Sequence, residues 1–301
     1  MVADNLVLIA GVGGVGRKVL EDLLAQGVSV RAMVRRDDER AAALRALGAE
    51  VVVGDLTRPE TVRTALEGVK RMYFAMPLSP DHLLAATVVA SVAREHGELD
   101  ALVGISQMTV SQMTATSTAE SHQQRLHWLA EQVLNWSGLP VVHIRPTSFL
   151  DNHLFTTLPA RTIKENGTIV LPFGTGRTSP VAVEDVARVV TTVLRNPVPH
   201  IGNVYELTGP RSVNMTELAE EFSRALGRPV SYVDVPLDRW QVEALSKMGL
   251  PPHIEQHVVI MGRLHQENRY DRTSPDVERV TGAAPQTIEA FVAARKGFYL
   301  G

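Results

Sequence analysis

The stretch LVLIAGVGGVGRKVLEDLL, residues 6–24, decides the fold. It opens with an uninterrupted apolar run over residues 6–10, which is typical of a parallel strand buried on both faces. Gly11, Gly13 and Gly16 follow in the G-x-G-x-x-G spacing, and apolar residues then recur at helical intervals. A buried strand, a glycine turn and an amphipathic helix in this order predict a site for the pyrophosphate of a dinucleotide.

Each glycine of this turn answers a separate physical need. Gly11 permits the tight turn, Gly13 lets the backbone approach a phosphate, and Gly16 lets the helix pack close to the strand. Gly14 and Val15 stand at the helix start, where free N–H groups and the positive end of the helix dipole favour an anion. The alternative is a glycine-rich loop that binds nothing.

Composition narrows the classes of protein that the chain can belong to. The 301 residues are 45% hydrophobic and 21% charged, as in an ordinary globular protein of one large or two modest domains. A net charge of −3 without a basic run argues against a nucleic acid partner. No apolar run reaches membrane-spanning length, no signal peptide is evident, and cysteine is absent, so we expect a cytoplasmic protein without disulfides. His253 and His257 have metal-ligand spacing, but no third ligand accompanies them and we expect no metal.

The end of the second expected strand predicts which dinucleotide binds. This strand covers residues 29–34 and runs into Arg35 and Arg36, about 20 residues beyond the glycine turn, where NAD-binding proteins carry an acid for the ribose. A guanidinium suits a 2′-phosphate instead, so the sequence favours NADP(H). Asp37 and Asp38 leave NAD open, and the arginines are alternatively only solvated loop residues.

Strand and helix patterns alternate over the rest of the first half. The further strands expected there cover residues 50–54, 71–75, 100–105 and 141–144. This alternation predicts an α/β fold with a doubly wound parallel sheet of the Rossmann type. We expect an NADP-binding domain over residues 1–150 and a smaller α+β C-terminal domain over residues 151–301 that closes a cleft, with the segment at about 180–205 returning to the first domain. Within the second half, residues 165–176 predict a hairpin and residues 269–285 a turn-rich connection.

Ligands of doubly wound sheets lie beyond the carboxyl ends of the strands. The residues at these ends are therefore the expected contacts. For the cofactor they are Asp55, Leu56, Ala75, Met76, Pro77, Ser106, Thr147 and Phe149, and for the substrate they include Gln107.

A doubly wound sheet with NADP suggests a relative of the short-chain dehydrogenases, which carry Tyr-x-x-x-Lys on the helix after the fifth strand. None of the five tyrosines here has a lysine four residues on. The corresponding helix carries His127 and Glu131 on one face. We expect His127 to contact the substrate and donate a proton, with Ser106 as a second catalytic residue. The alternative is that His127 and Glu131 only form a surface pair or pack. Residues 108–121, rich in Ser and Thr, form either a loop over the ligand or a surface connection.

Several further motifs resemble the NmrA-like family of atypical short-chain dehydrogenase relatives, and the resemblance covers nearly the whole chain. The motifs are the glycine turn with Val15-Gly16-Arg17, the Arg35 strand end, Gly54-Asp55-Leu56, Ser137-Gly138-Leu139-Pro140, the Arg-Pro-x-x-Phe-x-x-Asn segment at residues 145–152, and Val183-Glu184-Asp185-Val186-Ala187. The resemblance implies that the loop after the fourth strand lies along the cofactor. It also implies that Phe149 and Asn152 lie near the nicotinamide. As alternatives, Phe149 is a core residue and Asn152 ties the backbone.

Two functions are typical of that family. Some members reduce quinones, azo dyes, imines or carbonyls with NAD(P)H, and others bind NADP and regulate partner proteins. We expect an NADPH-dependent reductase of a small apolar or aromatic acceptor, with Trp240 in the substrate wall, although core packing or a dimer contact is the more ordinary role of such a residue. The rival is a non-catalytic NADP(H) sensor. The sequence leaves a homodimer open and names neither the acceptor nor the stereochemistry.

Overall fold

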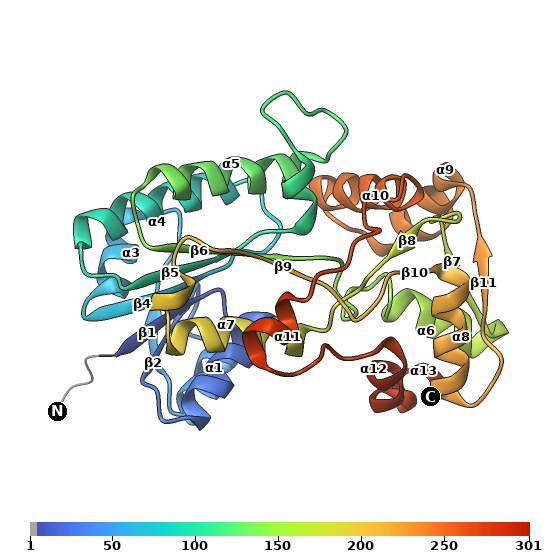
Figure 1. The fold of residues 1–301 in the computed structure, drawn as a ribbon, viewed down its shortest axis with the longest axis horizontal. Helices are drawn as coiled ribbons and strands as arrows, with labels where there is room; N and C mark the ends of the chain where they lie inside the picture. The colour runs from blue at the N-terminus through green and yellow to red at the C-terminus, as the bar shows by residue number, and fades with distance from the viewer. Residues whose placement is uncertain (1–4) are drawn as a thin grey trace. The chain divides into compact units, whose positions relative to one another are not determined.

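The structure, a computed structural model, describes residues 5–301, which form two compact units (Figure 1). The described part of unit 1 is residues 5–110, 125–145 and 186–205. Unit 2 is residues 111–124, 146–185 and 206–301. The chain thus passes between the units several times, and each unit is assembled from segments that are far apart in the sequence.

Unit 1 is organised around a seven-stranded sheet with the strand order β3-β2-β1-β4-β5-β6-β9. Its strands are β1 (Leu6–Ala10), β2 (Val30–Val34), β3 (Glu50–Val53), β4 (Val69–Phe74), β5 (Ala101–Ile105), β6 (Val141–Pro146) and β9 (Val204–Leu207). The pairs from β3 through β6 are parallel, which confirms the predicted doubly wound α/β fold. The chain runs from β1 to β2 and β3 on one side and returns to β4 on the other, and ligands of such sheets bind at that reversal.

Helices cover both faces of this sheet. They are α1 (Val15–Ala25), α2 (Glu39–Ala46), α3 (Pro59–Leu66), α4 (His82–His96), α5 (His122–Trp136) and α7 (Val183–Arg195), with a short 3₁₀ helix at Val198–His200. Figure 1 shows α4 and α5 on one face of the sheet and α1 and α7 on the other. Leu8, Met72 and Leu102, on neighbouring strands, are fully buried in one apolar cluster with residues of α3 and α4. Burial of strands on both faces explains their continuous apolar runs.

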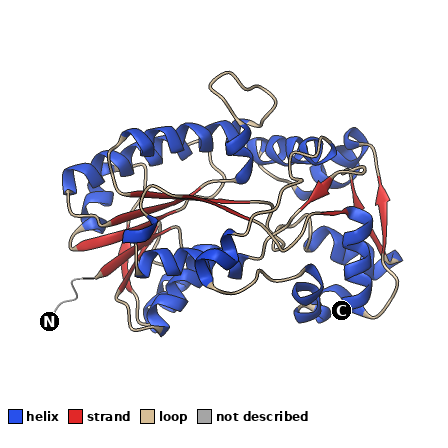
Figure 2. Cartoon of the chain, in the orientation of Figure 1, coloured by secondary structure: helices blue, strands red, loops and turns tan. Residues whose placement is uncertain are grey.

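Unit 2 combines helices with two small sheets, whose strands are red in Figure 2. Its elements are α6 (Thr157–Asn166), β7 (Thr168–Leu171), β8 (Arg177–Thr178), β10 (Val213–Asn214), α8 (Met215–Leu226), β11 (Ser231–Asp234), α9 (Leu237–Trp240), a π-helical turn (Gln241–Leu245), a 3₁₀ turn (Ser246–Met248), α10 (Pro252–Gln266), α11 (Asp276–Thr281), α12 (Ile288–Ala294) and α13 (Lys296–Leu300). Phe155, Phe222 and Phe291 are among the fully buried side chains of its core. Unit 2 therefore has an apolar core of its own.

One sequence-based expectation for unit 2 is wrong and another is incomplete. The predicted hairpin at residues 165–176 does not form, because β7 pairs in parallel with β11 and β8 pairs antiparallel with β10. Both partner strands lie far along the chain, so local turn signals could not reveal them. The turn-rich connection at residues 269–285 contains α11, a short helix that ends at Gly282 in the left-handed conformation.

Candidate functional site

The glycine turn between β1 and α1 has the close packing that its spacing predicts. Gly11 has φ +115°, and a side chain there would collide with the carbonyl group of Ala75 at the end of β4. A side chain at Gly16 would collide with the carbonyl of Gly11. Ala75 donates its N–H to the Ala10 carbonyl at 2.8 Å, so the loop after β4 lies against the turn. Two of the predicted cofactor residues, Gly11 and Ala75, are thus in contact.

The other glycines of the turn leave space for a ligand. A Cβ on Gly13 or Gly14 would meet no atom within 4 Å. Gly14 is the N-cap of α1, and neither a capping side chain nor an acidic residue occupies the first turn. The first N–H groups of a helix lack intrahelical acceptors, so this end of α1 offers them to an anion. The open cradle and its uncapped donors fit the pyrophosphate of a dinucleotide.

At the end of β2, the neighbouring acidic side chains already have partners. Asp37 pairs with both terminal nitrogens of Arg45, at 2.7 and 2.9 Å. Asp38 caps α2 by accepting from the backbone N–H groups of Arg40 and Ala41. Arg35 is 64% exposed and only 3.7 Å from a carboxylate oxygen of Asp55.

Asp55 is in turn held by Thr57. Its carboxylate accepts the backbone N–H and the hydroxyl of Thr57, and these bonds hold the pKa of Asp55 below its usual value. Leu56 packs against the apolar core of unit 1, and Arg36 is exposed. Arg35, Arg36 and Asp37 are all exposed after β2, but the Asp37 carboxylate is paired with Arg45, and the two adjacent guanidinium groups favour a 2′-phosphate over a bare ribose hydroxyl.

The carboxyl end of β5 carries a buried ionic cluster. Glu131 on α5 is 2% exposed and pairs through both oxygens with the guanidinium of Arg145 on β6. Its Oε1 also accepts the hydroxyl of Ser106, which directly follows β5. The sequence placed Ser106 and His127 in the site, but it did not reveal that Glu131 would bind Ser106 and Arg145 together.

A second histidine accompanies His127, and sequence reasoning missed it. The ring centroid of His82, the first residue of α4, lies 4.1 Å from that of His127 with the planes tilted by 50°. Within the described chain the Nδ1 of His82 is buried without a hydrogen-bond partner, and burial lowers the pKa of His82 to about 4. The only sequence signal was a histidine at the start of the helix after β4, an edge where ligands bind.

His82, Ser106, His127 and Glu131 line a cavity of about 10 Å³ in unit 1. This space holds one water molecule at most. His82, His127 and Glu131 are buried, and Ser106 is partly exposed. Of these four residues, Ser106 is therefore the one that a ligand reaches most readily.

The candidate residues of the second half lie in unit 2. Thr147 directly follows β6, is 5% exposed, and its hydroxyl has no partner among residues 5–301. Phe149 is partly buried and pairs in a β-bridge with Val181. The Asn152 side chain accepts the N–H of Leu154 at 3.0 Å, as expected of a residue that ties the backbone.

Trp240 is 3% exposed and lies within the core cluster of unit 2. This burial agrees with a core role for Trp240. The assignments of Phe149, Asn152 and Trp240 to ligand contacts stay predictions.

The segment after Ser106 is ordered. Its first part is a 3₁₀ helix at Met108–Gln112, and residues 111–124 belong to unit 2. Arg269 binds Glu120 at 2.7 Å, and its carbonyl accepts from Gln112 at 3.1 Å. The hydroxyl of Ser121 shares a hydrogen bond of 2.7 Å with Nδ1 of His257 on α10. These bonds fix the segment on unit 2, and its closure over a ligand stays a prediction.

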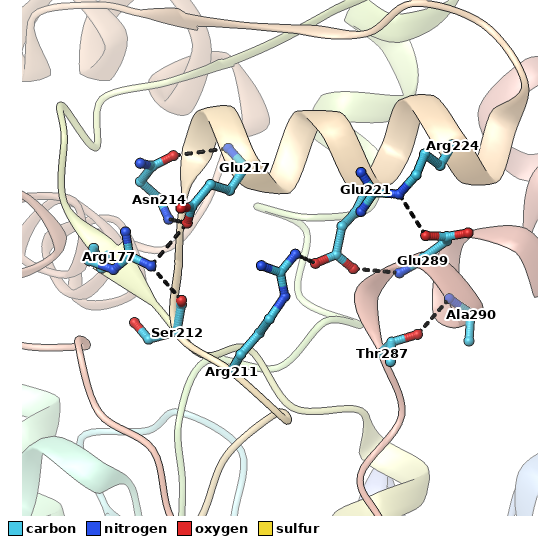
Figure 3. A network of polar contacts seen from close by, with 10 residues as sticks. All are labelled: Arg177, Arg211, Ser212, Asn214, Glu217, Glu221, Arg224, Thr287, Glu289 and Ala290. Carbon is cyan, nitrogen blue, oxygen red and sulfur yellow. Dashed lines mark hydrogen bonds and ion pairs between the residues drawn. The ribbon is translucent and has the colours of Figure 1, made fainter.

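Unit 2 also has a larger cavity, of about 270 Å³, lined by Pro180, Pro210, Arg211, Glu221, Arg224, Thr287, Ile288 and Glu289. Glu221 accepts from the Arg211 guanidinium and from the backbone N–H of Glu289 at 3.0 Å (Figure 3). Arg224 pairs with the Glu289 side chain at 2.8 Å. The charged side chains on this wall are paired with one another.

Residues 5–301 lack two further features. No group of three or more His, Asp or Glu side chains there is arranged to hold a metal ion. None of the helices in the same range is both long and apolar enough to cross a membrane.

Comparison with known proteins agrees with this geometry. A family described as NAD(P)H-binding matches residues 11–197. The chain is 29% identical to an NAD(P)H azoreductase from Xenophilus azovorans, over 96% of this chain and 97% of that protein.

Two solved structures share the fold. An NADPH-dependent quinone oxidoreductase from Escherichia coli in complex with NADPH superimposes with a TM-score of 0.82 at 22% identity, covering 96% of this chain and 99% of that one. NmrA, a negative transcriptional regulator in complex with NADP, superimposes with a TM-score of 0.80 at 17% identity, covering 96% and 94%. These likenesses show the shared fold, and with the NAD(P)H-binding family match they agree with the resemblance seen in the motifs.

Proposed function

The chain belongs to the NAD(P)H-binding family, and from this premise we propose that it is an NADPH-dependent reductase of a small apolar or aromatic acceptor. The acceptor class comprises quinones, azo compounds, imines and carbonyls. The observation that carries the proposal is the open glycine turn, where Gly13 and Gly14 leave room beside the uncapped start of α1. Similarity to an azoreductase over nearly the full length of both proteins supports the reductase assignment.

The geometry of unit 1 supports the following assignment of the cofactor residues. The backbone of the glycine turn binds the pyrophosphate, and Arg35 and Arg36 bind the 2′-phosphate. Asp55, Leu56 and the loop after β4 lie at the edge of the sheet where the adenosine half and the nicotinamide half are expected. When bound, NADPH supplies a hydride. We assign Thr147 and Phe149 to the nicotinamide end on the family resemblance and their place after β6.

The reaction does not depend on a Tyr-Lys pair. The helix after β5 carries His127 and Glu131 instead, and Glu131 is engaged with Arg145. Hydride transfer depends mainly on position and the exclusion of water. Hydride transfer to a conjugated acceptor needs less help from an acid than hydride transfer to a plain ketone. Conjugated acceptors therefore suit a site that has His127 as its proton donor and no Tyr-Lys pair. In this assignment Gln107 and Asn152 contribute to acceptor binding.

A non-catalytic NADP(H) sensor is the second candidate. Structural similarity to the regulator NmrA favours it, and that similarity extends over 96% of this chain. A sensor would bind NADP⁺ and NADPH with unequal affinity and transmit the difference to a partner protein. It would not oxidise NADPH, whichever acceptor is supplied.

The decisive experiment measures NADPH oxidation against a panel of quinones, azo dyes, imines and ketones. We expect turnover with the conjugated acceptors and a slower rate for His127→Ala. No turnover with any acceptor, together with unequal binding of the two oxidation states, would establish the sensor. An unchanged rate for His127→Ala would remove that residue from proton transfer.

A matched pair of glycine variants tests the cofactor site. Gly13→Asp places a carboxylate in open space beside the expected phosphates, and Gly297→Asp makes the same change in open space on α13 of unit 2. We expect Gly13→Asp to weaken NADPH binding by more than about 100-fold through charge repulsion, since two charges at contact distance interact strongly in a partly dry site. Gly297→Asp should leave the affinity unchanged. Equal affinities in both variants would place the pyrophosphate elsewhere.

A further inference from the structure

The hydrogen of the Ser106 hydroxyl is already used in a hydrogen bond to Glu131. A hydroxyl has one hydrogen to donate and two lone pairs that accept. Ser106 donates to Oε1 of Glu131, whose carboxylate pairs with Arg145 and has no hydrogen to give back. Toward a ligand, Ser106 can therefore act only as an acceptor.

The surroundings of this bond keep it in that orientation. Arg145 binds both carboxylate oxygens of Glu131, and its Nε lies 3.0 Å from the oxygen that also accepts from Ser106. Glu131 is 2% exposed, so the carboxylate is not free to rotate toward solvent. Ser106 itself is partly exposed at the carboxyl end of β5, where substrates of this fold lie.

This polarity has a consequence for the choice of substrate. A serine that donates would stabilise the oxygen of a ketone or quinone as negative charge develops on it. Ser106 cannot do so here, and a carbonyl oxygen placed against its lone pairs would be repelled. An N–H group at the same place would be bound.

We infer that Ser106 acts as a hydrogen-bond acceptor toward the substrate and selects acceptors that carry an N–H group at the reducible bond, of which a protonated imine is the simplest. If bound NADPH supplies the hydride, one C–H bond of the nicotinamide would break and one C–H bond would form at the carbon of the protonated imine, while the π electron pair moves onto nitrogen. NADPH would thereby be oxidised to NADP⁺ and the protonated imine reduced to a neutral amine, with no further proton needed. Protonated imines exist near neutral pH and protonated carbonyls do not. Of these acceptors, the protonated imine therefore already carries the N–H donor that Ser106 can bind. The inference rests on the proposed reductase and names its substrate class.

A binding test avoids turnover altogether. Diphenylamine and diphenyl ether differ by one N–H donor, and neither accepts a hydride. With NADP⁺ present, we expect the natural protein to bind diphenylamine about three to ten times more tightly than the ether, the ratio that one ordinary hydrogen bond supports. Ser106→Ala should bind the two probes equally, and Ser106→Thr, which keeps the hydroxyl, should restore the preference.

Ser212→Ala is the matched control. Ser212 donates to the carboxylate of Asp271 at 2.6 Å, so this variant also removes a serine–carboxylate bond, but in unit 2. It should keep the preference for diphenylamine. A preference that survives in Ser106→Ala, or is absent from the natural protein, overturns the inference, as does a failure of both probes to bind.

The nicotinamide carboxamide is another source of N–H donors. If the carboxamide were the partner of Ser106, Ser106→Ala would bind NADPH about three to ten times more weakly. The natural protein would then show no preference between the two probes. We expect a smaller loss of NADPH affinity than this, because the inference assigns the lone pairs of Ser106 to the substrate and not to the cofactor contact that the sequence predicts. Turnover of quinones without any probe preference leaves the reductase standing and refutes the role of Ser106. A clear preference without turnover of any acceptor supports that role and refutes the reductase.

Discussion

Each unit of the molecule contains a buried glutamate that pairs with an arginine. In unit 1, Glu131 is 2% exposed and its partner Arg145 is 18% exposed. In unit 2, Glu221 is 4% exposed and its partner Arg211 is 52% exposed. The third group on Glu131 is the hydroxyl of Ser106 at a strand end, whereas the third group on Glu221 is the backbone N–H of Glu289.

The difference shows how one interaction serves two purposes. Glu221 joins the start of α12 to α8 and satisfies a backbone donor that has no intrahelical acceptor (Figure 3). Glu131 joins α5 to β6 and sets the polarity of a side chain at the ligand edge. A buried ion pair alone therefore does not mark a functional site. In our proposal, the Ser106 hydroxyl that completes the Glu131 pair is what distinguishes it.

The largest expected effect separates the two pairs by stability. Arg145→Ala leaves Glu131 as an unpaired buried charge, and we expect a loss of about 3–5 kcal/mol in the free energy of unfolding. Arg211→Ala removes a half-exposed partner and leaves Glu221 its backbone donor, so about 1 kcal/mol should be lost. Urea unfolding of both variants measures the two values. Equal losses would mean that the two pairs are equivalent after all.

Buried histidines extend the comparison to acid. Burial lowers the pKa of His82 in unit 1 and of His265 in unit 2 to about 4. The unfolded chain titrates near 6.5, so between that pH and about 4 it binds protons that the folded protein does not. Stability therefore falls as the pH drops through this window, by up to about 3 kcal/mol for each histidine.

Single substitutions isolate each of these contributions. His82→Phe and His265→Phe should each reduce the slope of stability against pH by up to about 1.4 kcal/mol per pH unit. His265 stacks between Phe173 and Tyr270, at 4.0 Å from each ring, so a phenyl ring fits its place. Chemical unfolding at several pH values between 7 and 4 gives the slopes. A slope unchanged in one variant would show that the histidine in that unit is protonated or solvated when folded.

Cofactor preference is the next comparison, and it concerns affinity. Arg35→Asp removes the expected partner of the 2′-phosphate in unit 1, and we expect NADPH to bind about 10- to 100-fold more weakly, as for a charge-assisted hydrogen bond. NADH should lose much less. Arg161→Asp, at a 78% exposed position in unit 2, makes the same charge change as a control. Equal losses for NADPH and NADH would argue against a 2′-phosphate at Arg35.

The contrast between the units also explains what the sequence could predict. Unit 1 is predictable because each of its signals is local: the glycine turn, the apolar strand runs and the stops between them lie within a few residues of what they specify. The strand ends at Arg35 and Ser106 followed from the same pattern. Sequence spacing alone could not show that Ser106, Glu131 and Arg145 meet, because their contact depends on the order β5-β6 and on the helix between them.

Unit 2 was predicted less well, for the opposite reason. Its small sheets join β7 to β11 and β8 to β10 across long stretches of chain, and no short motif encodes those pairings. His82 was overlooked in unit 1 because a histidine at a helix start has many ordinary roles. Its contact with His127 depends on how α4 and α5 pack.

The smallest expected effects concern two helix caps, one in each unit. The Asp38 side chain caps α2 in unit 1 by accepting from Arg40 and Ala41. In unit 2 the Asn214 side chain caps α8 by accepting the backbone N–H of Glu217. The Glu217 carboxylate accepts the backbone N–H of Asn214 in return. We expect Asp38→Ala to lower stability by about 0.5–1 kcal/mol and Asn214→Ala by about 1–2 kcal/mol. We expect the larger loss for Asn214→Ala because α8 carries the buried Glu221 and packs into the core of unit 2. Fraying of its first turn would disturb both. Thermal unfolding of both variants measures the two losses. If Asp38→Ala proved the costlier, α2 would support more of unit 1 than its exposed surface indicates.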